Sequence, residues 1–419
     1  MAKIKQIFAT EILNAKGHPT IEATVTLTDG SIGIASCPSG TSMGKYEAVE
    51  IRDKDEKRFQ GLGVLNAIMN IEEIIAPNLV GMEATKQQDI DKKMIALDGT
   101  NNKARLGANA VLSVSMAVAK AAAKSSVLPL FLYLREFIKR ENTPLKIPTP
   151  LFNLINGGMH AEGSLDFQEF LVIPATSKKY EDALQIGTNV YAALKKSLET
   201  NNLSTLIGDE GGYSPKVASN QDALVMLKQV IEGLNLRLGF DVFLGLDAAS
   251  NNFYENQQYH IHDKSIGLSS KDLIEFYKTL NNDYHFLYLE DGLAEDDWEG
   301  WTNLCADLSQ QTLIVGDDLT ATNPYRLQMA LDKKTITGII IKPNQIGTVM
   351  EALAVVEMAR DAGLKITVSH RSGETNDDFI ADFAVAASAD YVKFGAPVRG
   401  ERVAKYNRLL QIQRQLKSL

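Results

Sequence analysis

The fold of this chain is indicated first by three segments: FLGLD at 243–247, FLYLE at 286–290 and LIVGD at 313–317. Each is an apolar run that ends in an acid. An ionised carboxylate is costly to bury without a partner, so packing alone gives a buried strand no reason to end in one. Carboxylates that converge at one end of a parallel barrel would hold a hard divalent metal, which prefers oxygen ligands. The acids are Asp247, Glu290 and Asp317.

The same pattern continues with basic residues at later strand ends. Lys342 follows TGIII, His370 and Arg371 follow KITVS, and Lys393 follows DYV. Successive polar strand ends are mostly roughly 25 residues apart, which is about one strand, one helix and two loops. Acids on the earlier strands and cations on the later ones predict a metal site facing a proton-transfer site. That arrangement indicates an enzyme.

Composition limits the classes of partner. The chain has 419 residues, of which 45% are hydrophobic and 23% charged, as is ordinary for a soluble globular protein. The net charge is −9 and the chain has no dense Lys/Arg block, so neither nucleic acid nor a membrane is expected as its partner. An anionic small molecule stays possible, because local cations and a metal can outweigh the global charge.

Cysteines and apolar segments indicate a cytoplasmic protein. Cys37 and Cys305 are too few for a disulfide framework or a Cys-rich metal site, so reduced thiols are expected. The N-terminal segment has no long apolar core and is not a signal peptide. Lys120 and Lys124 interrupt the apolar stretch 108–134, which is therefore predicted to be a core helix and not a membrane span.

The organisation along the chain predicts two domains. Residues 4–35 alternate as strands do, and 63–138 follow a helical period. Strands followed by helices are typical of an α+β domain. The proline-rich 143–150 precedes the alternating strands and helices, so the expected domains are 1–140 and 141–419.

Polar residues also gather in short segments that are ambiguous one by one. In 369–375, SHRSGET, Arg371 and Ser372 follow a strand and would suit an anion such as phosphate, or would simply cap a helix. In GDEGG, glycines let Glu210 approach a ligand closely, although an acidic surface turn fits as well.

Other segments add weaker indications. In FQEF, the neighbours Gln168 and Glu169 cannot both face solvent within an apolar strand, unless the strand lies at a sheet edge. The glycine-rich loops NGGMH and PSGTSMG carry His160 and Ser42 as potential ligands.

Taken together and in order, these segments resemble the enolase family. The resemblance runs from residue 4 to the final helix, and a barrel relative sharing only the metal acids would lack GDEGG and SHRSGET. The fold it implies is a small N-terminal α+β domain capping an eight-stranded α/β barrel whose second strand runs antiparallel. The stretches that carry it are PSGTSMGKYEAVEIRD, LDGTNNKARLGANAVLSVS, NGGMH, FQEF, GDEGG, GLDAAS, EDGLAEDDWEGW, GDDLTATN, IKPNQIGT, SHRSGETNDDFIAD and KFGAP.

The resemblance implies the reversible dehydration of 2-phospho-D-glycerate to phosphoenolpyruvate. Removing a proton next to a carboxylate builds an enediolate, whose charge is the main catalytic problem. The enolase superfamily is known to solve it with a Lys or His base and one or two Mg²⁺ ions. Two Mg²⁺ are implied here, the first held by the three strand-end acids and the second by Ser42.

Further roles follow from the resemblance alone. Lys342 matches the base, and Lys393 would lie beside the substrate carboxylate and, with the metals, depress the pKa of Lys342. Glu210 matches the general acid, paired with Glu169 so that the pKa of one carboxyl is raised. His370 is counted with these four as catalytic. The implied substrate contacts are His160, Gln168, Glu169, Arg371, Ser372 and Lys393.

Some positions depart from the family pattern. Asn14-Ala15-Lys16 replaces Asp-Ser-Arg near the expected contact of a homodimer or higher homo-oligomer, and Lys lacks the bidentate pairing of Arg. Gly292 replaces a proline, and Met43 and Lys45 alter the loop that carries Ser42. Two other functions stay open: a superfamily lyase acting on another acid, and a non-catalytic binding or structural protein with this fold.

Overall fold

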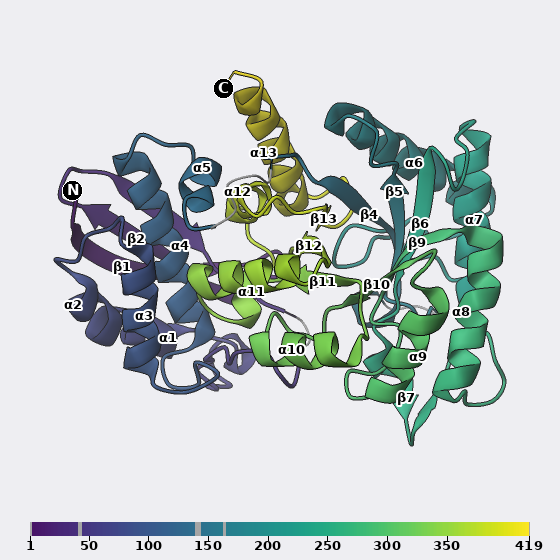
Figure 1. Ribbon diagram of the computed structural model, residues 1–419, viewed down its shortest axis with the longest axis horizontal. Helices are drawn as coiled ribbons and strands as arrows, with labels where there is room; N and C mark the ends of the chain where they lie inside the picture. Colours follow the sequence, from purple (N-terminus) through teal and green to yellow (C-terminus); the bar gives the residue numbers. More distant parts are fainter. Residues whose placement is uncertain (1, 41–43, 139–143, 162–164, 419) are drawn as a thin grey trace.

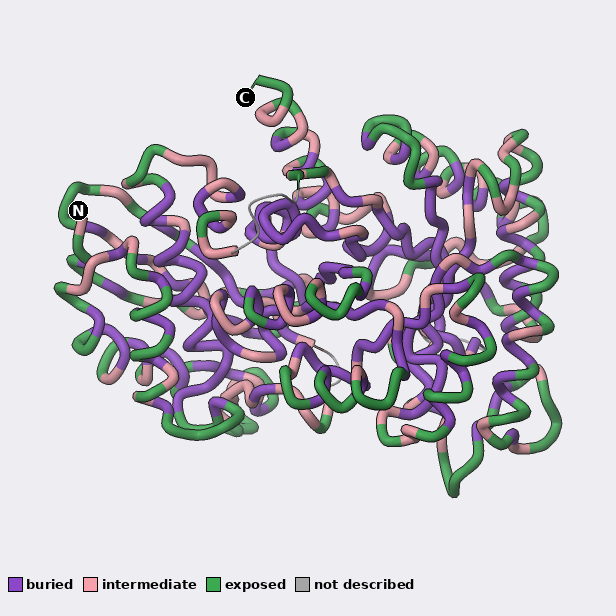
Figure 2. Tube along the Cα trace, in the orientation of Figure 1, coloured by how far each residue is buried: buried purple, intermediate pink, exposed green. Residues whose placement is uncertain are grey.

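The computed structural model describes residues 2–40, 44–138, 144–161 and 165–418. Figure 1 shows two units side by side, a sheet with helices at the N-terminal end of the chain and a larger barrel. Buried residues concentrate in the strands and between the two units, whereas exposed residues follow the outer helices (Figure 2).

The N-terminal unit is built on a three-stranded antiparallel sheet in the order β1-β2-β3. Its strands are β1 (Ile4–Leu13), β2 (Pro19–Leu27) and β3 (Ile32–Ser36). Alternate residues of β2, among them Ile21, Ala23 and Val25, are fully buried, which gives the period of two expected of a half-buried strand. The prediction of strands in this region is confirmed.

Helices cover one face of this sheet, as the sequence predicts for an α+β domain. The long helix α4 packs on β2 and β3 and is buried on nearly all sides. The stretch 108–134, predicted as one core helix, forms two, α4 (Ala108–Ser125) and α5 (Leu130–Arg135), with Pro129 between them. No helix in the described part of the chain is long and apolar enough to cross a membrane. The elements are η1 (Phe59–Gly61), α1 (Leu65–Met69), the π-helix η2 (Asn70–Ile75), α2 (Ala76–Leu79), α3 (Gln87–Asp98), α4 (Ala108–Ser125) and α5 (Leu130–Arg135).

Gly33 allows α4 to approach β3 closely. A Cβ at this position would lie 2.0 Å from the carbonyl oxygen of Ala117 and 2.5 Å from the backbone nitrogen of Ala121. We expect Gly33→Ala to lower the free energy of unfolding by about 1–3 kcal/mol or more, because backbone atoms cannot yield as a side chain can. Denaturant titration measures this, with Gly233→Ala as control. Nothing lies within 4 Å of a Cβ there, and equal losses in both variants would contradict the steric explanation.

The larger unit is a closed eight-stranded barrel in the order β10-β11-β12-β13-β4-β5-β6-β9. β5 is antiparallel to both of its neighbours and the other pairs are parallel, as the family resemblance implies. The strands are β4 (Thr149–Asn156), β5 (Glu169–Pro174), β6 (Val242–Asp247), β9 (Phe286–Glu290), β10 (Leu313–Gly316), β11 (Gly338–Ile341), β12 (Lys365–Ser369) and β13 (Tyr391–Lys393).

Helices surround the barrel, and apolar side chains fill it. One small cluster takes residues from six strands, including Tyr288 and Ile340, and is separate from the main core between strands and helices. The barrel is therefore packed inside and offers no channel. The surrounding helices are α6 (Tyr180–Thr200), α7 (Asn220–Gly233), α8 (Ser270–Tyr284), α9 (Trp298–Leu308), α10 (Pro324–Lys333), α11 (Val349–Asp361), α12 (Phe379–Ala386) and α13 (Gly400–Leu416). Short elements between them are η3 (Gly158–His160), η4 (Ser250–Phe253), β7 (Tyr254–Glu255), β8 (Gln258–Tyr259) and η5 (Pro343–Gln345).

Polar side chains of the N-terminal unit bind the N-terminus of the barrel helix α11. The Asp91 carboxylate accepts a hydrogen bond from the backbone N–H of Met350 (3.0 Å), and the Ser115 hydroxyl accepts one from Val349 (3.1 Å). The first N–H groups of a helix have no partner within the helix, so these contacts satisfy α11 from across the junction. The two units are thus joined by helix capping as well as by apolar packing.

Asp91 makes this junction sensitive to pH. Burial raises the pKa of Asp91 to about 7 from 3.8, although the bonds from Met350 and Ser115 act against the rise. The folded protein then holds a proton that the unfolded chain releases, so stability falls as the pH rises between these two values. We expect Asp91→Asn, which mimics the neutral acid, to lose less stability from pH 5 to pH 8 than wild type. Denaturant titrations of both proteins at the two pH values test this, and parallel changes would contradict it.

Candidate active site

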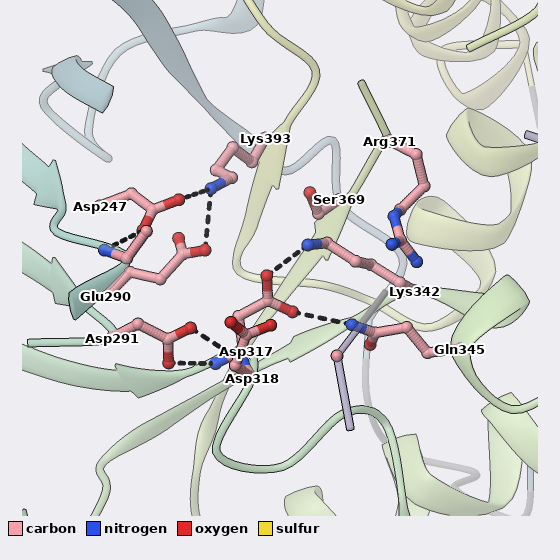
Figure 3. A network of polar contacts seen from close by, with 12 residues as sticks. Asp247, Glu290, Asp291, Asp317, Asp318, Lys342, Gln345, Ser369, Arg371 and Lys393 are labelled. Atoms are coloured by element: carbon pink, nitrogen blue, oxygen red, sulfur yellow. Dashed lines mark hydrogen bonds and ion pairs between the residues drawn. The ribbon is translucent and has the colours of Figure 1, made fainter. Parts of the chain in front are cut away.

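The residues predicted at strand ends meet at one end of the barrel (Figure 3). Asp247 and Glu290 are the last residues of β6 and β9, Lys393 is the last of β13, and Asp317 and Lys342 directly follow β10 and β11. Parallel strands bring their carboxyl ends to one edge of the barrel, which explains why residues distant in sequence become neighbours.

These residues surround a pocket of 510 Å³. Its lining includes all of the predicted site residues except Glu290, which lies fully buried beneath it, and Ser42, which falls outside the described residues. The lining residues that were predicted from the sequence are His160, Gln168, Glu169, Glu210, Asp247, Asp317, Lys342, His370, Arg371, Ser372 and Lys393.

Lys393 is the central cation of the acidic side. Its Nζ lies 2.8 Å from Asp247 Oδ2, 2.8 Å from Glu290 Oε1 and 3.1 Å from Glu169 Oε1. All four side chains are at most 3% exposed. One ammonium group therefore serves three buried carboxyl groups.

This group of acids suits a hard divalent cation. Burial and then the charge of Asp247 raise the pKa of Glu290 well above its usual value, although Lys393 opposes the rise. A buried carboxyl that resists ionisation beside a second carboxylate indicates room for more positive charge. The donor atoms are carboxylate oxygens from Asp247, Glu290 and Asp317, the ligand type that Mg²⁺ and Ca²⁺ prefer. The residues present thus fit such an ion.

Asp317 connects this acidic group to Lys342. Its Oδ2 forms an ion pair with Lys342 Nζ, and its Oδ1 accepts a hydrogen bond from Gln345 Nε2 at 3.1 Å. Burial acts to lower the pKa of Lys342, and Arg371 and Lys393 act in the same direction, but the charges of Asp317 and Glu290 oppose them and the net direction is upward. The depressed pKa expected for Lys342 is therefore not produced by the protein's own groups.

Asp291 supports Asp317 and had no role in the sequence interpretation. Its carboxylate oxygens accept hydrogen bonds from the backbone N–H groups of Asp317 (3.0 Å) and Asp318 (2.8 Å). It thereby links the end of β9 to the loop after β10, as Figure 3 shows. The signal was the second acid directly after Glu290, although nothing in the sequence says that it binds backbone.

Arg371 is held by a residue that the sequence did not single out. The Glu47 carboxylate binds its guanidinium through two oxygens, at 2.8 and 3.2 Å, and Asn344 Oδ1 accepts a third bond at 3.2 Å. The side chains of Arg371 and Glu47 are each 6% exposed. Glu47 comes from the N-terminal unit, so both units contribute to this end of the pocket.

Glu210 and Glu169 form a second buried group with His160. His160 Nδ1 lies 3.6 Å from Glu210 Oε1 and 3.8 Å from Glu169 Oε1. Burial and then the charge of Glu210 raise the pKa of Glu169 well above its usual value. Burial also acts to raise that of Glu210, but His370, His160 and Arg402 bring it well below. The pair thus has one raised pKa, as expected, but at Glu169 and not at the expected acid.

Several buried polar atoms around this pair have no hydrogen-bond partner within the described chain. They include His160 Nδ1, Glu169 Oε2, Asn153 Oδ1 and both side-chain polar atoms of Asn156. Buried polar groups are normally satisfied, so unpartnered atoms beside an open pocket indicate where a polar ligand or water binds. The part of the pocket around Glu210, Glu169 and His160 can therefore bind hydrogen-bonding groups of a ligand.

The fold and the pocket define an α/β-barrel enzyme whose strand ends carry acids on one side and lysines on the other. Family comparison agrees: residues 4–134 match the enolase N-terminal domain and 144–419 match the enolase C-terminal TIM barrel domain. The curated enolases of Helicobacter pylori strains HPAG1 and J99 are each 46% identical over 418 residues, which span 100% of this chain and 97% of theirs. The chain belongs to the enolase family, and it is an enzyme of the lyase class with the 2-phosphoglycerate dehydration activity of that family.

Proposed function

We propose that the reaction is carried by Lys342 on one side of the pocket and by the Glu210–Glu169 pair on the other. The Lys342 side chain is 12% exposed at the pocket. Arg371 and Lys393 act to lower its pKa, and a metal ion bound at Asp317 would weaken the charge interaction that now raises it. In its neutral form Lys342 takes the proton from C2 of 2-phosphoglycerate. The observation that carries the proposal is the convergence of this lysine with the buried strand-end acids on one pocket.

The acid group acts at the leaving hydroxyl. Glu210 and Glu169 are both buried and their charges interact, so they titrate as a pair, with the pKa of Glu169 raised and that of Glu210 lowered. Such a pair is suited to share one proton. We propose that this proton reaches the C3 hydroxyl through Glu210, which His370 and Asn153 contact at 3.1 Å. His160, which lines the same side, would contact the departing group.

The remaining polar residues bind the substrate. Arg371 presents a guanidinium that Glu47 and Asn344 hold in place, and with Ser372 it would bind the phosphate. Lys393 and Gln168 would contact the substrate carboxylate. A buried and fully charged arginine is suited to this task, because its fixed fork matches phosphate geometry.

We propose two Mg²⁺ ions per site. Asp247, Glu290 and Asp317 would hold the first, and Ser42, which lies outside the described residues, would hold the second. Bound there, the ions would neutralise the substrate carboxylate and the enediolate charge.

We further propose a domain boundary near residue 140, which gives the domains 1–140 and 141–419. We also propose a homodimer or higher homo-oligomer and a cytoplasmic location.

The test is the absorbance of phosphoenolpyruvate formed from 2-phosphoglycerate, with Mg²⁺ and then with excess chelator. Turnover that is lost with the chelator and restored by Mg²⁺ supports the proposal. Turnover of an unphosphorylated sugar acid in its place would identify another lyase of the superfamily. A folded, Mg²⁺-loaded protein with no turnover of either would leave a binding or structural role.

A further inference from the structure

Arg402 is a fully buried arginine in the first turn of α13, outside the pocket lining. Its Nη1 donates hydrogen bonds to His370 Nδ1 (2.7 Å) and to the carbonyl oxygen of Arg371 (2.6 Å). Its Nη2 donates to the carbonyl oxygens of Ser372 (2.7 Å) and Asp209 (3.2 Å). One guanidinium thus binds both the loop after β12 and the loop that carries Glu210.

These contacts determine which nitrogen of His370 carries the proton. A guanidinium offers five donors, no acceptor, and stays protonated in proteins. His370 Nδ1 must therefore accept the hydrogen bond from Arg402 and has no hydrogen of its own. A neutral imidazole has a single N–H, so that hydrogen is on Nε2.

The Nε2 atom of His370 points to the proposed acid. It lies 3.1 Å from Glu210 Oε2, a contact distance that lacks the alignment of a good hydrogen bond. The charged groups acting on the ring are Glu210, Arg402 and Lys393. Burial, helped by the two cations, lowers the pKa of His370 to about 3 against the pull of Glu210. The ring is therefore neutral, with its Nε2–H on the side of Glu210.

We infer that Arg402 is a positioning residue that fixes His370 in the Nε2–H tautomer and so orients the Glu210 carboxyl. This inference rests on the proposed acid role of Glu210. Arg402 also binds the Arg371 and Ser372 carbonyls and the Asp209 carbonyl together, so it sets the spacing between the phosphate end and the acid end of the pocket. Catalytic geometry is sensitive to such spacing, because a displacement of about 1 Å can cost about 10²-fold in rate.

The tautomer can be measured directly in the wild-type protein. Two-bond ¹H–¹⁵N correlation spectra of histidine-labelled protein distinguish a bare Nδ1 from a protonated one. The chain has six histidines, and the His370 signals are those that disappear in His370→Gln. We expect a bare Nδ1, a protonated Nε2 and no titration between about pH 5 and 8. A protonated Nδ1 would overturn the inference, whether or not the enzyme turns over its substrate.

Substitution separates positioning from structural support. We expect Arg402→Met to lower kcat by about 10²-fold and to give a His370 ring that titrates or populates both tautomers. Arg402→Lys, which keeps the charge but not the fork, should restore part of kcat. The control is Arg408→Met on the same helix, where the guanidinium binds the buried Asp382 through two bonds of 2.7 Å.

The Arg408→Met control separates a loss of stability from a loss of positioning. Arg408→Met should lose stability but keep kcat and the His370 spectrum of wild type. An Arg402→Met protein that folds with wild-type kcat and an unchanged His370 tautomer would overturn the inference. If Arg402→Met does not fold, the wild-type spectrum decides the tautomer, so the inference stays testable. Absent wild-type turnover with the expected tautomer would instead count against the proposed function.

Discussion

Lys342→Ala is expected to lower kcat by about 10²–10⁴-fold, the contribution usual for a positioned acid or base. Lys342 lines the pocket together with Arg371 and Lys393, and its Nζ forms an ion pair with Asp317. The variant should also lose exchange of the C2 hydrogen of 2-phosphoglycerate with deuterated solvent, because that exchange requires the base but not the departure of the hydroxyl. Absorbance and NMR measure the two effects.

Two further substitutions test whether Lys342 acts as a base or only as a positive charge. Lys342→Arg keeps a cation beside Asp317 but cannot act as a base near neutral pH, so it should be as inactive as Lys342→Ala. Lys333→Ala, on the exposed side of α10, should match wild type. If Lys342→Arg retained turnover or C2 exchange, the base would have to be another residue.

The second large effect is expected from Lys393→Met, which removes the cation shared by three buried carboxylates. Asp247, Glu290 and Glu169 would then lie buried without their 2.8–3.1 Å partner. Breaking a buried ion pair by removing one member costs about 3–5 kcal/mol. We expect a loss of that size in the free energy of unfolding, measured by denaturant titration with chelator present.

Divalent cations should reverse part of this loss. An ion that binds the folded variant but not the unfolded chain raises its stability by mass action, and the freed carboxylates are suitable ligands. The control is Lys365→Met, because that lysine pairs with Asp390 at 3.5 Å with its side chain 52% exposed and should cost about 0–1 kcal/mol. A Lys393→Met protein as stable as wild type, with or without Mg²⁺, would show that these acids are not ionised together.

The sequence alone predicted the architecture and eleven of the residues that line the pocket. Apolar runs ending in Asp247, Glu290 and Asp317 can be read without coordinates, because a buried strand end is an improbable place for an acid unless strand ends share a site. Local patterning likewise predicted strands within residues 4–35 and a core helix in the stretch 108–134, of which α4 forms the first part. The antiparallel β5 came only from the family resemblance, since periodicity carries no strand direction.

How these groups act on one another follows from their positions in the folded chain. The charge of Asp317 acts to raise the pKa of Lys342. Burial raises the pKa of Glu169, whereas His370, His160 and Arg402 lower that of Glu210 against the effect of its burial. The sequence pattern likewise did not indicate the supporting residues Glu47, Asp291 and Arg402. They act through contacts with backbone groups of segments that are distant in sequence. Electrostatic effects of buried groups depend on the distances between them and on the exclusion of water, and a linear pattern contains neither.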